Sequence, residues 1–359
     1  MGTISLCMIV KNEEAVLARC LDSVQGIADE IIVCDTGSAD RTKEIAGEYT
    51  DLVFDFEWID DFAAARNFSF SKATQEYILW LDADDVIEPA DRDAFLLFKE
   101  TLGPPVDLVM MPYRVAFDAD GNPTTTYERE RLLRRECNYR WESPIHEAIP
   151  PSGHIIHCPI AVSHRKLGPG DPDRNLRIFE SMLRQGLRLE PRQQFYYARE
   201  LMYHQRYEEA ASHFQSLLDD GEGWVENKIS ACQDLSNCLL ALGRKAEARQ
   251  ALCRSMCYDA PRAEVCCALG ASFCAEGDFL SAIHWYETAR RRDKNTCGGF
   301  CFPDCHDFIP LVQLCVCYDR LGEHKKAEKC HRAAKRLKPN DAAVQYNEAY
   351  FRRLRSQAK

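Results

Sequence analysis

Three acidic residues, Asp82, Asp84 and Asp85, stand directly after a short apolar segment at residues 77–81. Carboxylates one residue apart at the end of a strand can point into one cleft, and their oxygens are the ligands that Mg²⁺ and Mn²⁺ prefer. Such an ion neutralises the charge that develops on a diphosphate leaving group. The competing interpretation is an acidic start of the following helix, because Asp also caps helices. Taken alone, the three residues favour the helix start.

Strand-like and helix-like segments alternate over the first third of the chain. Strand formers fill residues 4–10, 31–34, 52–54 and 77–81. Helical patterns follow over residues 16–24, from residue 40, and over residues 62–73. Asn12 is placed to cap the first of these helices. The alternation predicts a mostly parallel sheet with right-handed crossovers, whose ligands bind beyond the carboxyl ends of the strands.

Polar clusters follow three of these predicted strands, at residues 11–13, 35–38 and 82–85. Because the carboxyl ends of parallel strands meet at one edge of a sheet, we expect the three clusters to lie close together. This position favours a ligand site over a simple helix start for Asp82 and Asp84.

A helical pattern repeats from about residue 174 onward. Ala recurs five positions after a turn, at residues 210, 248, 282 and 327, with spacings of 38, 34 and 45 residues. A period of 34 residues is that of the tetratricopeptide repeat, in which a small side chain lets two helices pack closely. We therefore expect an α/β domain over residues 1–170 and an all-α repeat domain over residues 171–359.

Four motifs of the α/β domain keep one order and spacing: Ile-Val-Lys-Asn-Glu-Glu at 9–14, Asp-Thr-Gly-Ser-Ala-Asp at 35–40, Ala-Arg-Asn at 65–67 and Leu-Asp-Ala-Asp-Asp at 81–85. Together they resemble the inverting glycosyltransferases of family two, whose catalytic domain has the Rossmann-like GT-A fold. Lys11 departs from the broad family, in which an aromatic residue is common there. The Lys-Asn-Glu variant is similar to a subgroup with a C-terminal tetratricopeptide array, which includes the bacteriocin-modifying peptide S-glycosyltransferases.

The resemblance implies a nucleotide-sugar donor, with a UDP-hexose as the first expectation. The residues that would bind the donor are Ile9, Val10, Lys11, Asn12, Glu13, Asp35, Thr36, Arg66, Asn67, Asp82, Ala83 and Arg131. Of these, residues 9–14 would hold the uracil and ribose, Asp35 would face the base, and Arg66 and Asn67 would lie near the diphosphate. Arg131 and Arg134 could clamp phosphates, or they could be solvated strand residues.

The same resemblance implies a Mn²⁺ or Mg²⁺ site formed by Asp84, His164 and Asp82. Enzymes of GT-A fold often use a His at the position of His164 as a further metal ligand, and a purely structural His is the alternative. Asp84 would hold the metal directly, whereas Asp82 would act through water or bind ribose.

An inverting displacement also needs a base near the acceptor. Glu147 is the first candidate, because residues 141–147 look like the His-Glu segment of the subgroup, and Glu142 is the reserve. The alternative is that His146 and Glu147 form a structural pair.

The acceptor is predicted less sharply than the donor. Helical arrays commonly bind peptides on a concave surface, which favours transfer to Cys, Ser or Thr of a peptide or protein. A glycan or a lipid-linked acceptor is the alternative among enzymes, and a non-catalytic repeat scaffold is the alternative of another class. Residues 346–351 could cap the array or pair two chains, so a homodimer is an open expectation.

Composition argues against several other kinds of protein. A formal net charge of −11 argues against general nucleic-acid binding. No run of 18 apolar residues predicts a transmembrane helix, and Lys11 and Glu13 interrupt the short apolar N-terminus, which is a poor signal peptide. Eighteen cysteines then favour free thiols in the cytoplasm. Cys297, Cys301 and Cys305 lack Cys-x-x-Cys spacing, so we expect a thiol-rich loop rather than a zinc site there.

Overall fold

The computed structural model describes residues 2–168, 170–293 and 299–357. The chain forms two compact units, Met1–Ala116 with Thr126–Leu189, and Phe117–Thr125 with Glu190–Lys359. The expected domain boundary at residue 170 stays a proposal beside this division.

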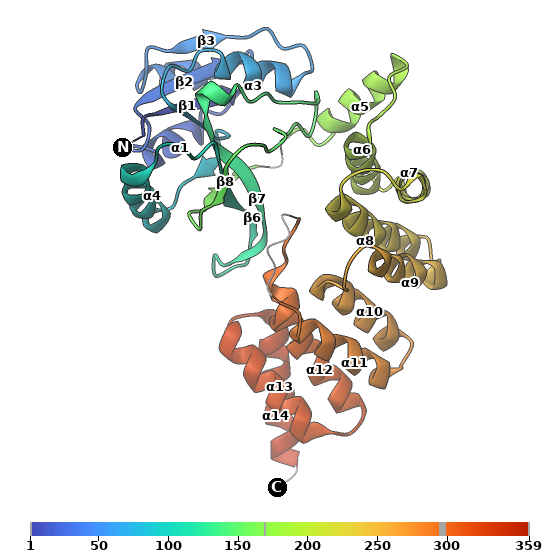
Figure 1. Ribbon diagram of the computed structural model, residues 1–359. Coiled ribbons are helices and arrows are strands. Elements are labelled where there is room, and N and C mark those ends of the chain that lie inside the picture. Colours follow the sequence, from blue (N-terminus) through green and yellow to red (C-terminus); the bar gives the residue numbers. More distant parts are fainter. Residues whose placement is uncertain (1, 169, 294–298, 358–359) are drawn as a thin grey trace. The chain divides into compact units, whose positions relative to one another are not determined.

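A nine-stranded sheet organises the first unit (Figure 1). Its strands are β1 Ile4–Val10, β2 Glu30–Asp35, β3 Val53–Asp55, β4 Tyr77–Trp80, β5 Asp85–Val86, β6 Leu108–Phe117, β7 Pro123–Arg134, β8 Ile155–His157 and β9 Val162–His164. They lie in the order β3-β2-β1-β4-β7-β6-β9-β5, and β8 pairs with β6. Strands β1 to β4 are mutually parallel, whereas β7 runs antiparallel to β4. This is the mostly parallel sheet of a GT-A-like domain.

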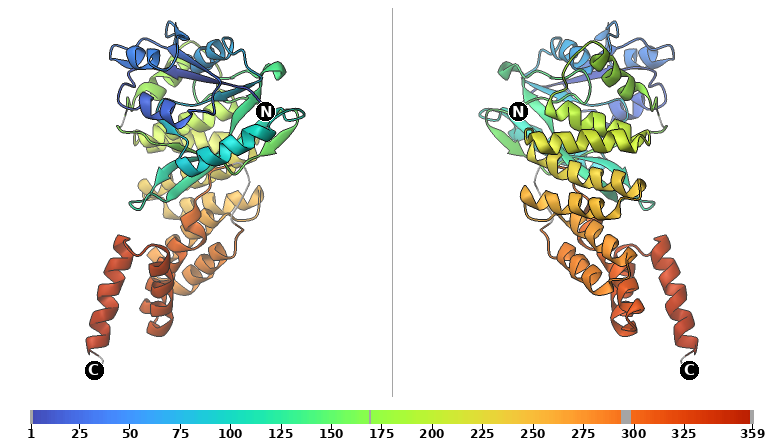
Figure 2. Two further views of the ribbon diagram at one scale, coloured as in Figure 1. Left: turned by 90° about the vertical axis from the view of Figure 1, so that its left-hand side faces the viewer. Right: turned by 90° about the vertical axis from the view of Figure 1, so that its right-hand side faces the viewer.

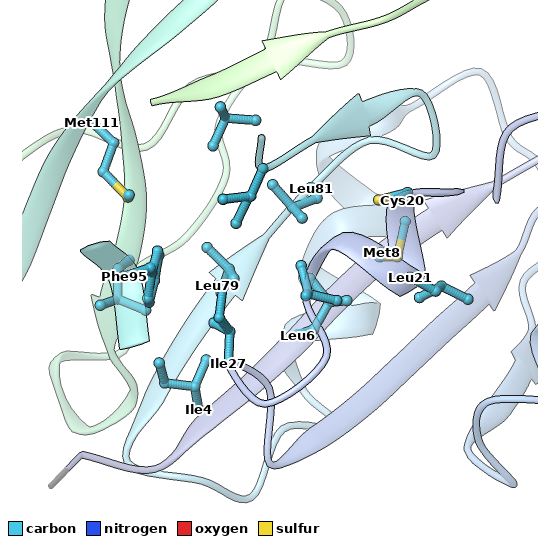
Figure 3. Close-up of a cluster of buried hydrophobic side chains, with 14 of the residues drawn as sticks. Ile4, Leu6, Met8, Cys20, Leu21, Ile27, Leu79, Leu81, Phe95 and Met111 are labelled. Atoms are coloured by element: carbon cyan, nitrogen blue, oxygen red, sulfur yellow. The ribbon is translucent and has the colours of Figure 1, made fainter. Parts of the chain in front are cut away.

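Helices cover both faces of this sheet, because its central strands are apolar on both sides. The helices of the first unit are α1 Leu17–Ser23, α2 Thr42–Gly47, α3 Phe62–Phe70, α4 Pro89–Thr101 and α5 Arg174–Arg184, and a 3₁₀ turn spans Arg135–Cys137. Ile4, Leu6 and Met8 of β1 pack in one cluster with α1 and α4 (Figure 3). Cys7, between them, packs in the opposite cluster with Trp80, as the two-residue period of a strand requires.

The four predicted strands of this region are confirmed, and each end lies within one residue of its expected position. The predicted helix over 62–73 ends earlier, at Phe70. The predicted cap of the first helix is wrong: Val16 occupies the N-cap position, and the Asn12 side chain instead accepts a hydrogen bond from the backbone N–H of Ala39 (2.8 Å). Asn12 has a positive φ of 56°, which turns the chain away from β1 before the helix begins.

The second unit consists mainly of helices (Figure 2). They are α6 Pro191–Tyr203, α7 Tyr207–Asp220, α8 Val225–Ala241, α9 Lys245–Arg254, α10 Ala263–Ala275, α11 Phe279–Arg290, α12 Phe308–Arg320, α13 His324–Leu337 and α14 Ala342–Gln357, with 3₁₀ turns at Ser255–Cys257 and Pro303–His306. Consecutive helices α6 to α13 pack as four pairs. The four repeating Ala residues each lie near the start of the second helix of a pair and are buried, as the tetratricopeptide pattern predicts.

None of the helices in the described part of the chain is both long and apolar enough to cross a bilayer. Cys297 lies outside the described residues, so the three-cysteine loop is not described as a whole. Within it, Cys305 is buried, and its backbone carbonyl accepts a hydrogen bond from the thiol of Cys267 (3.5 Å).

Close packing between α10 and α11 depends on Gly270. A Cβ atom at this position would meet ring carbons of the buried Tyr286 at 2.8 Å. We therefore expect Gly270→Ala to lower the free energy of unfolding by about 1–2 kcal/mol, because overpacking outweighs the better helix propensity of Ala. Urea denaturation followed by circular dichroism measures the change. Gly47→Ala in α2 is the control, since its Cβ has open space; equal stability changes in both variants would contradict the packing argument.

Candidate functional site

The acidic residues that follow β4 are tied into one turn. The backbone N–H of Asp85 donates to the carbonyl of Asp82 (3.0 Å), and the N–H of Asp82 donates to Oδ2 of Asp85 (3.0 Å). Strand β5 pairs antiparallel with β9, which places Asp85 opposite His164. The sheet therefore brings together two segments that are about eighty residues apart in the chain.

A buried ion pair fixes this turn from the protein interior. Arg131 of β7 and Asp85 have fully buried side chains, and Nη1 of Arg131 donates to Oδ2 of Asp85 (3.0 Å) and to the carbonyl of Trp80 (3.1 Å). The guanidinium carbon also lies 3.8 Å from the Trp80 ring centre and 4.3 Å from that of Tyr113. Arg131 is thus paired with Asp85 and buried, and the expectation that it contacts phosphate stays a prediction.

Asp84, Asp85 and His164 each offer a ligand atom within 4.8 Å of the others. Nδ1 of His164 lies 3.2 Å from Oδ1 of Asp84 and 3.5 Å from Oδ1 of Asp85. Burial lowers the pKa of His164, but the hydrogen bonds to the two carboxylates outweigh burial and raise it to about 10. Oxygen and imidazole ligands fit Mn²⁺ or Mg²⁺. Asp82, predicted as a ligand, is not in this cluster, whereas Asp85 was not predicted.

Exposure separates the roles of the three side chains. Asp85 is fully buried, whereas Asp84 is 16% and His164 28% exposed. Asp85 already accepts hydrogen bonds from Arg131, Tyr113 and the N–H of Asp82. Asp84 and His164 are therefore the two side chains positioned to face an ion, and Asp85 supports them.

Tyr113 of β6 connects Asp85 to His164. Its hydroxyl donates to Oδ1 of Asp85 (2.8 Å) and lies 3.0 Å from Nδ1 of His164. A carboxylate only accepts, so the hydroxyl proton points to Asp85 and the oxygen is left to accept the hydrogen of Nδ1. This arrangement orients the imidazole as the support of a metal-binding His does, and Nε2 becomes the ligand atom once an incoming ion displaces its proton. Tyr113 was not predicted, because it lies within strand β6 and belongs to none of the motifs that mark the site in the sequence.

Arg66 of α3 links Asp82 to Glu147, in the segment of residues 141–147. Its Nη2 donates to Asp82 (2.6 Å) and its Nε donates to Glu147 (2.6 Å). The guanidinium carbon also lies beside the rings of Trp80 and Trp141, 5.0 and 4.8 Å from their centres. Burial raises the pKa of Asp82, but the charges of Arg66 and Arg131 outweigh it and lower the pKa to about 2. Asp82 is thus held ionised beside the cluster and is 34% exposed.

The loops after β1 and β2 form one hydrogen-bonded unit. The N–H and hydroxyl of Thr36 donate to the carbonyl of Val10 (2.9 and 3.1 Å), and the N–H of Glu13 donates to the hydroxyl of Thr42 (2.7 Å). Ile9 and Val10 are the last two residues of β1, and Lys11 and Asn12, which follow them, are exposed. These two loops lie at the same sheet edge as the acidic turn, as the strand order predicts.

Asp35 is buried at the end of β2 and has one unused oxygen. Its Oδ1 accepts from the N–H groups of Gly37 and Ser38 (both 2.9 Å). Its Oδ2 is buried and has no hydrogen-bond partner among the described residues. An N–H group of a ligand would satisfy this oxygen.

Glu13 brings a further carboxylate to the same edge. Burial, followed by the negative charges of Asp84 and Asp82, raises the pKa of Glu13 to about 7. The electrostatic coupling shows that the β1 loop and the acidic turn share one electronegative environment, which suits a cation. The main-chain position of Ala83, between the two carboxylates, is buried.

The segment of residues 141–147, which holds the two predicted base candidates, is fixed by contacts with α3. The side-chain amide of Asn67 donates to the carbonyl of Trp141 (3.0 Å) and accepts from its N–H (2.9 Å), so Asn67 holds this segment in place. Glu147 is 12% exposed and paired with Arg66. Glu142 is exposed, and its backbone pairs with Ala148. The ring of His146 stacks on that of Phe179, with 6.0 Å between the ring centres.

Comparison with known proteins assigns the first domain. Residues 5–158 match the family described as Glycosyl transferase family 2. The N-terminal part of the chain is a family 2 glycosyltransferase domain. This family 2 domain contains the acidic turn and both loops, and residues 162–164 with His164 follow the matched segment.

Three curated relatives show the range of similarity. A TPR repeat-containing protein of Synechococcus elongatus is 40% identical over 153 residues, which are 42% of this chain and 36% of that protein. The SPbeta prophage-derived glycosyltransferase SunS of Bacillus subtilis is 27% identical over 234 residues, 61% of this chain and 54% of SunS. The lipopolysaccharide core biosynthesis glycosyltransferase LpsC of Rhizobium meliloti is 29% identical over 164 residues, 42% of this chain and 58% of LpsC. The chain therefore spans less than two thirds of each relative.

Two solved structures show limited similarity to the chain. Glucosyl-3-phosphoglycerate synthase from Mycobacterium tuberculosis, in complex with Mn²⁺ and UDP-glucose, is 18% identical with a TM-score of 0.36, covering 53% of this chain and 81% of that one. YrrB, described as a TPR protein with an unusual peptide-binding site, is 16% identical with a TM-score of 0.38, covering 50% and 84%.

Removing Arg131 tests its structural assignment. We expect Arg131→Met to lower the free energy of unfolding by about 3–5 kcal/mol, because Asp85 is left as an unpaired buried charge. Urea denaturation measures this, and Arg140→Met is the matched control, since Arg140 is exposed. Wild-type stability together with weaker UDP binding in Arg131→Met would restore the phosphate role.

Tyr113→Phe removes only the hydroxyl that orients His164. We expect the dissociation constant for Mn²⁺, measured by electron paramagnetic resonance, to rise about 10- to 100-fold, as is typical when the support of a metal-binding His is lost. Tyr49→Phe is the control, because its hydroxyl also donates to a carboxylate, Asp22 (3.0 Å), on the surface near α1. Equal Mn²⁺ affinities in wild type and Tyr113→Phe would contradict the assignment.

Proposed function

We propose that the chain transfers a sugar from a UDP-sugar to a peptide or protein acceptor, in a metal-dependent displacement that inverts the anomeric carbon. The observation that carries the proposal is the placement of Asp84 and His164 side by side at the carboxyl edge of a family 2 domain. The loops of β1 and β2 at the same edge offer the groups that a nucleotide would contact.

In this proposal, Asp84 and His164 would hold Mn²⁺ or Mg²⁺, which would supply positive charge for the diphosphate. Asp35, through its unpaired Oδ2, accepts an N–H of the uracil, and residues 9–13 with Thr36 surround the nucleoside. Arg66 keeps Asp82 ionised next to the cluster, where Asp82 would act through water or bind the ribose. Asp85, Tyr113 and Arg131 position these groups from below.

Glu147 is the proposed general base for the acceptor. Arg66 holds its carboxylate near the acidic turn, since the same guanidinium contacts both Glu147 and Asp82. A carboxylate fixed in this way accepts a proton from a thiol or hydroxyl once the acceptor is in place. Glu142 remains the reserve candidate, because it is exposed on the neighbouring strand pair.

The acceptor assignment rests on the repeat unit, whose helix pairs are typical of peptide-binding arrays. The similarity to the glycosyltransferase SunS supports sugar transfer by this chain. The similarity to LpsC favours a second candidate, a lipid-linked glycan acceptor. We further propose that the chain acts in the cytoplasm, where the seventeen cysteines described as free stay reduced. Pairing of two copies remains a prediction.

Donor turnover tests the proposed function. The purified chain is incubated with a panel of UDP- and GDP-sugars, with and without Mn²⁺, and released nucleoside diphosphate is measured. We expect slow Mn²⁺-dependent hydrolysis of one UDP-sugar, reduced at least about a hundredfold in Asp84→Asn, since one ligand carboxylate is lost. Asp51→Asn, at an exposed site, is the control.

The assay also separates the alternatives. Full metal-dependent turnover in Asp84→Asn would overturn the metal assignment. Absence of hydrolysis together with absence of nucleotide-sugar binding in the same samples would favour the non-catalytic scaffold.

A further inference from the structure

The last two helices carry a concentration of positive charge in an acidic chain. Residues 324–356 contain ten Lys and Arg residues but three Asp and Glu residues, whereas the whole chain has a net charge of −11. These residues form α13 and α14, at the C-terminal end of the helical array (Figure 1).

Four of these cations form a stripe on α13. Lys325, Lys329, Arg332 and Arg336 follow the spacing i, i+4, i+7, i+11, which places them on one side of a helix. All four are exposed, and the buried residues Ala327, Cys330, His331 and Ala334 lie on the opposite side. Arg355 of α14 joins the stripe through Glu328, whose Oε1 accepts from both Arg332 (2.9 Å) and Arg355 (2.6 Å). The five cations are called the basic face.

The charge of the basic face is largely uncompensated. Lys325, Lys329 and Arg336 have no ion-pair partner in the described part of the chain, and Glu328 is shared between two arginines. By contrast, cations on the flanks of α13 are paired: Lys335 with Glu348 (3.0 Å), and Lys338 with Asp304 (2.7 Å).

Comparison with the other repeats shows that an outward helix face does not require these residues. The equivalent positions, counted from the buried Ala of each repeat, are Glu208, Ser212, Gln215 and Asp219 in the first, Ala246, Gln250, Cys253 and Cys257 in the second, and Leu280, His284, Glu287 and Arg291 in the third. The acidic pair of the first repeat is compensated by arginines: Glu208 lies 3.7 Å from Arg244 and Asp219 lies 2.8 Å from Arg254. Solvation alone therefore does not account for four cations in the last repeat.

We propose that the basic face binds the anionic headgroups of a phospholipid surface, an interaction that is independent of the acceptor assigned above. Lysines that are exposed and unpaired suit a diffuse, fluid array of negative charge, whereas protein interfaces are depleted in Lys and enriched in aromatic residues. The stripe has no Asn, Gln or aromatic side chain with which to read or stack on bases. Leu337, next to Arg336, is 46% exposed, and an apolar side chain beside cations suits a headgroup layer.

Vesicle sedimentation of the full chain tests this proposal. The probes are phosphatidylcholine vesicles with about one third phosphatidylglycerol and vesicles of phosphatidylcholine alone, at about 50 and about 300 mM salt. We expect binding to the anionic vesicles that weakens at high salt, and little binding to the neutral ones. The variant Lys325→Glu, Lys329→Glu, Arg336→Glu should bind the anionic vesicles about a hundredfold more weakly, because each cation at such a surface contributes roughly fivefold in affinity.

A matched variant separates local from global charge. Arg184→Glu, Arg188→Glu, Lys245→Glu makes the same change of net charge at exposed sites outside the basic face, and should bind as wild type. The corresponding Lys325→Gln, Lys329→Gln, Arg336→Gln variant covers the case in which charge reversal prevents folding, as judged by circular dichroism. Equal vesicle binding by the folded stripe variant and the matched variant would overturn the proposal. Two other results would also overturn it: binding of duplex DNA without vesicle binding, or salt-sensitive self-association that the stripe variant abolishes.

Discussion

The buried ion pair between Arg131 and Asp85 is the constraint on which the rest of the site depends. Neither side chain is exposed, so each charge is stable in the interior only because the other lies 3.0 Å away. Through Asp85, the pair fixes the turn that presents Asp84, and through Tyr113 it fixes the imidazole of His164. In the family 2 domain, the buried Arg131–Asp85 pair therefore supports the partly exposed pair of Asp84 and His164. Strands β4, β5, β7 and β9 must all be in register for both pairs to form.

The positive charge of Arg66 likewise holds two carboxylates of the site in place. The guanidinium lies beside two Trp rings and contacts carboxylates from two segments, Asp82 after β4 and Glu147 in the loop that follows β7. The donor-side and acceptor-side carboxylates are thereby held at one guanidinium. This arrangement gives the proposed transfer a physical basis. The diphosphate would bind on the Asp82 side of the Arg66 guanidinium and the acceptor on the Glu147 side, and neither would have to break an Arg66 ion pair.

The sequence was sufficient for β1 to β4 and for the repeating helices, because local patterns determine them. Apolar strands with a two-residue period, a recurrent buried Ala and the Asp-rich turn are each visible within a few residues of chain. The pairing of Asp85 with Arg131, 46 residues apart, and the contact of Tyr113 with His164, 51 residues apart, arise from strand order in the second half of the sheet. Arg131 was therefore predicted as a phosphate ligand, and Asp85 and Tyr113 were missed. Asn12 was predicted as a helix cap for a similar reason, since its partner Ala39 belongs to another loop.

The central claim is that Asp84 and His164 together hold the ion that binds the donor diphosphate. A crystal structure of the full chain with Mn²⁺ and UDP, with anomalous data for manganese, tests it most directly. The account predicts one anomalous peak about 2 Å from an oxygen of Asp84 and from Nε2 of His164, with the uracil at Asp35. A manganese peak that is coordinated without His164, or a uracil bound away from Asp35, would contradict it.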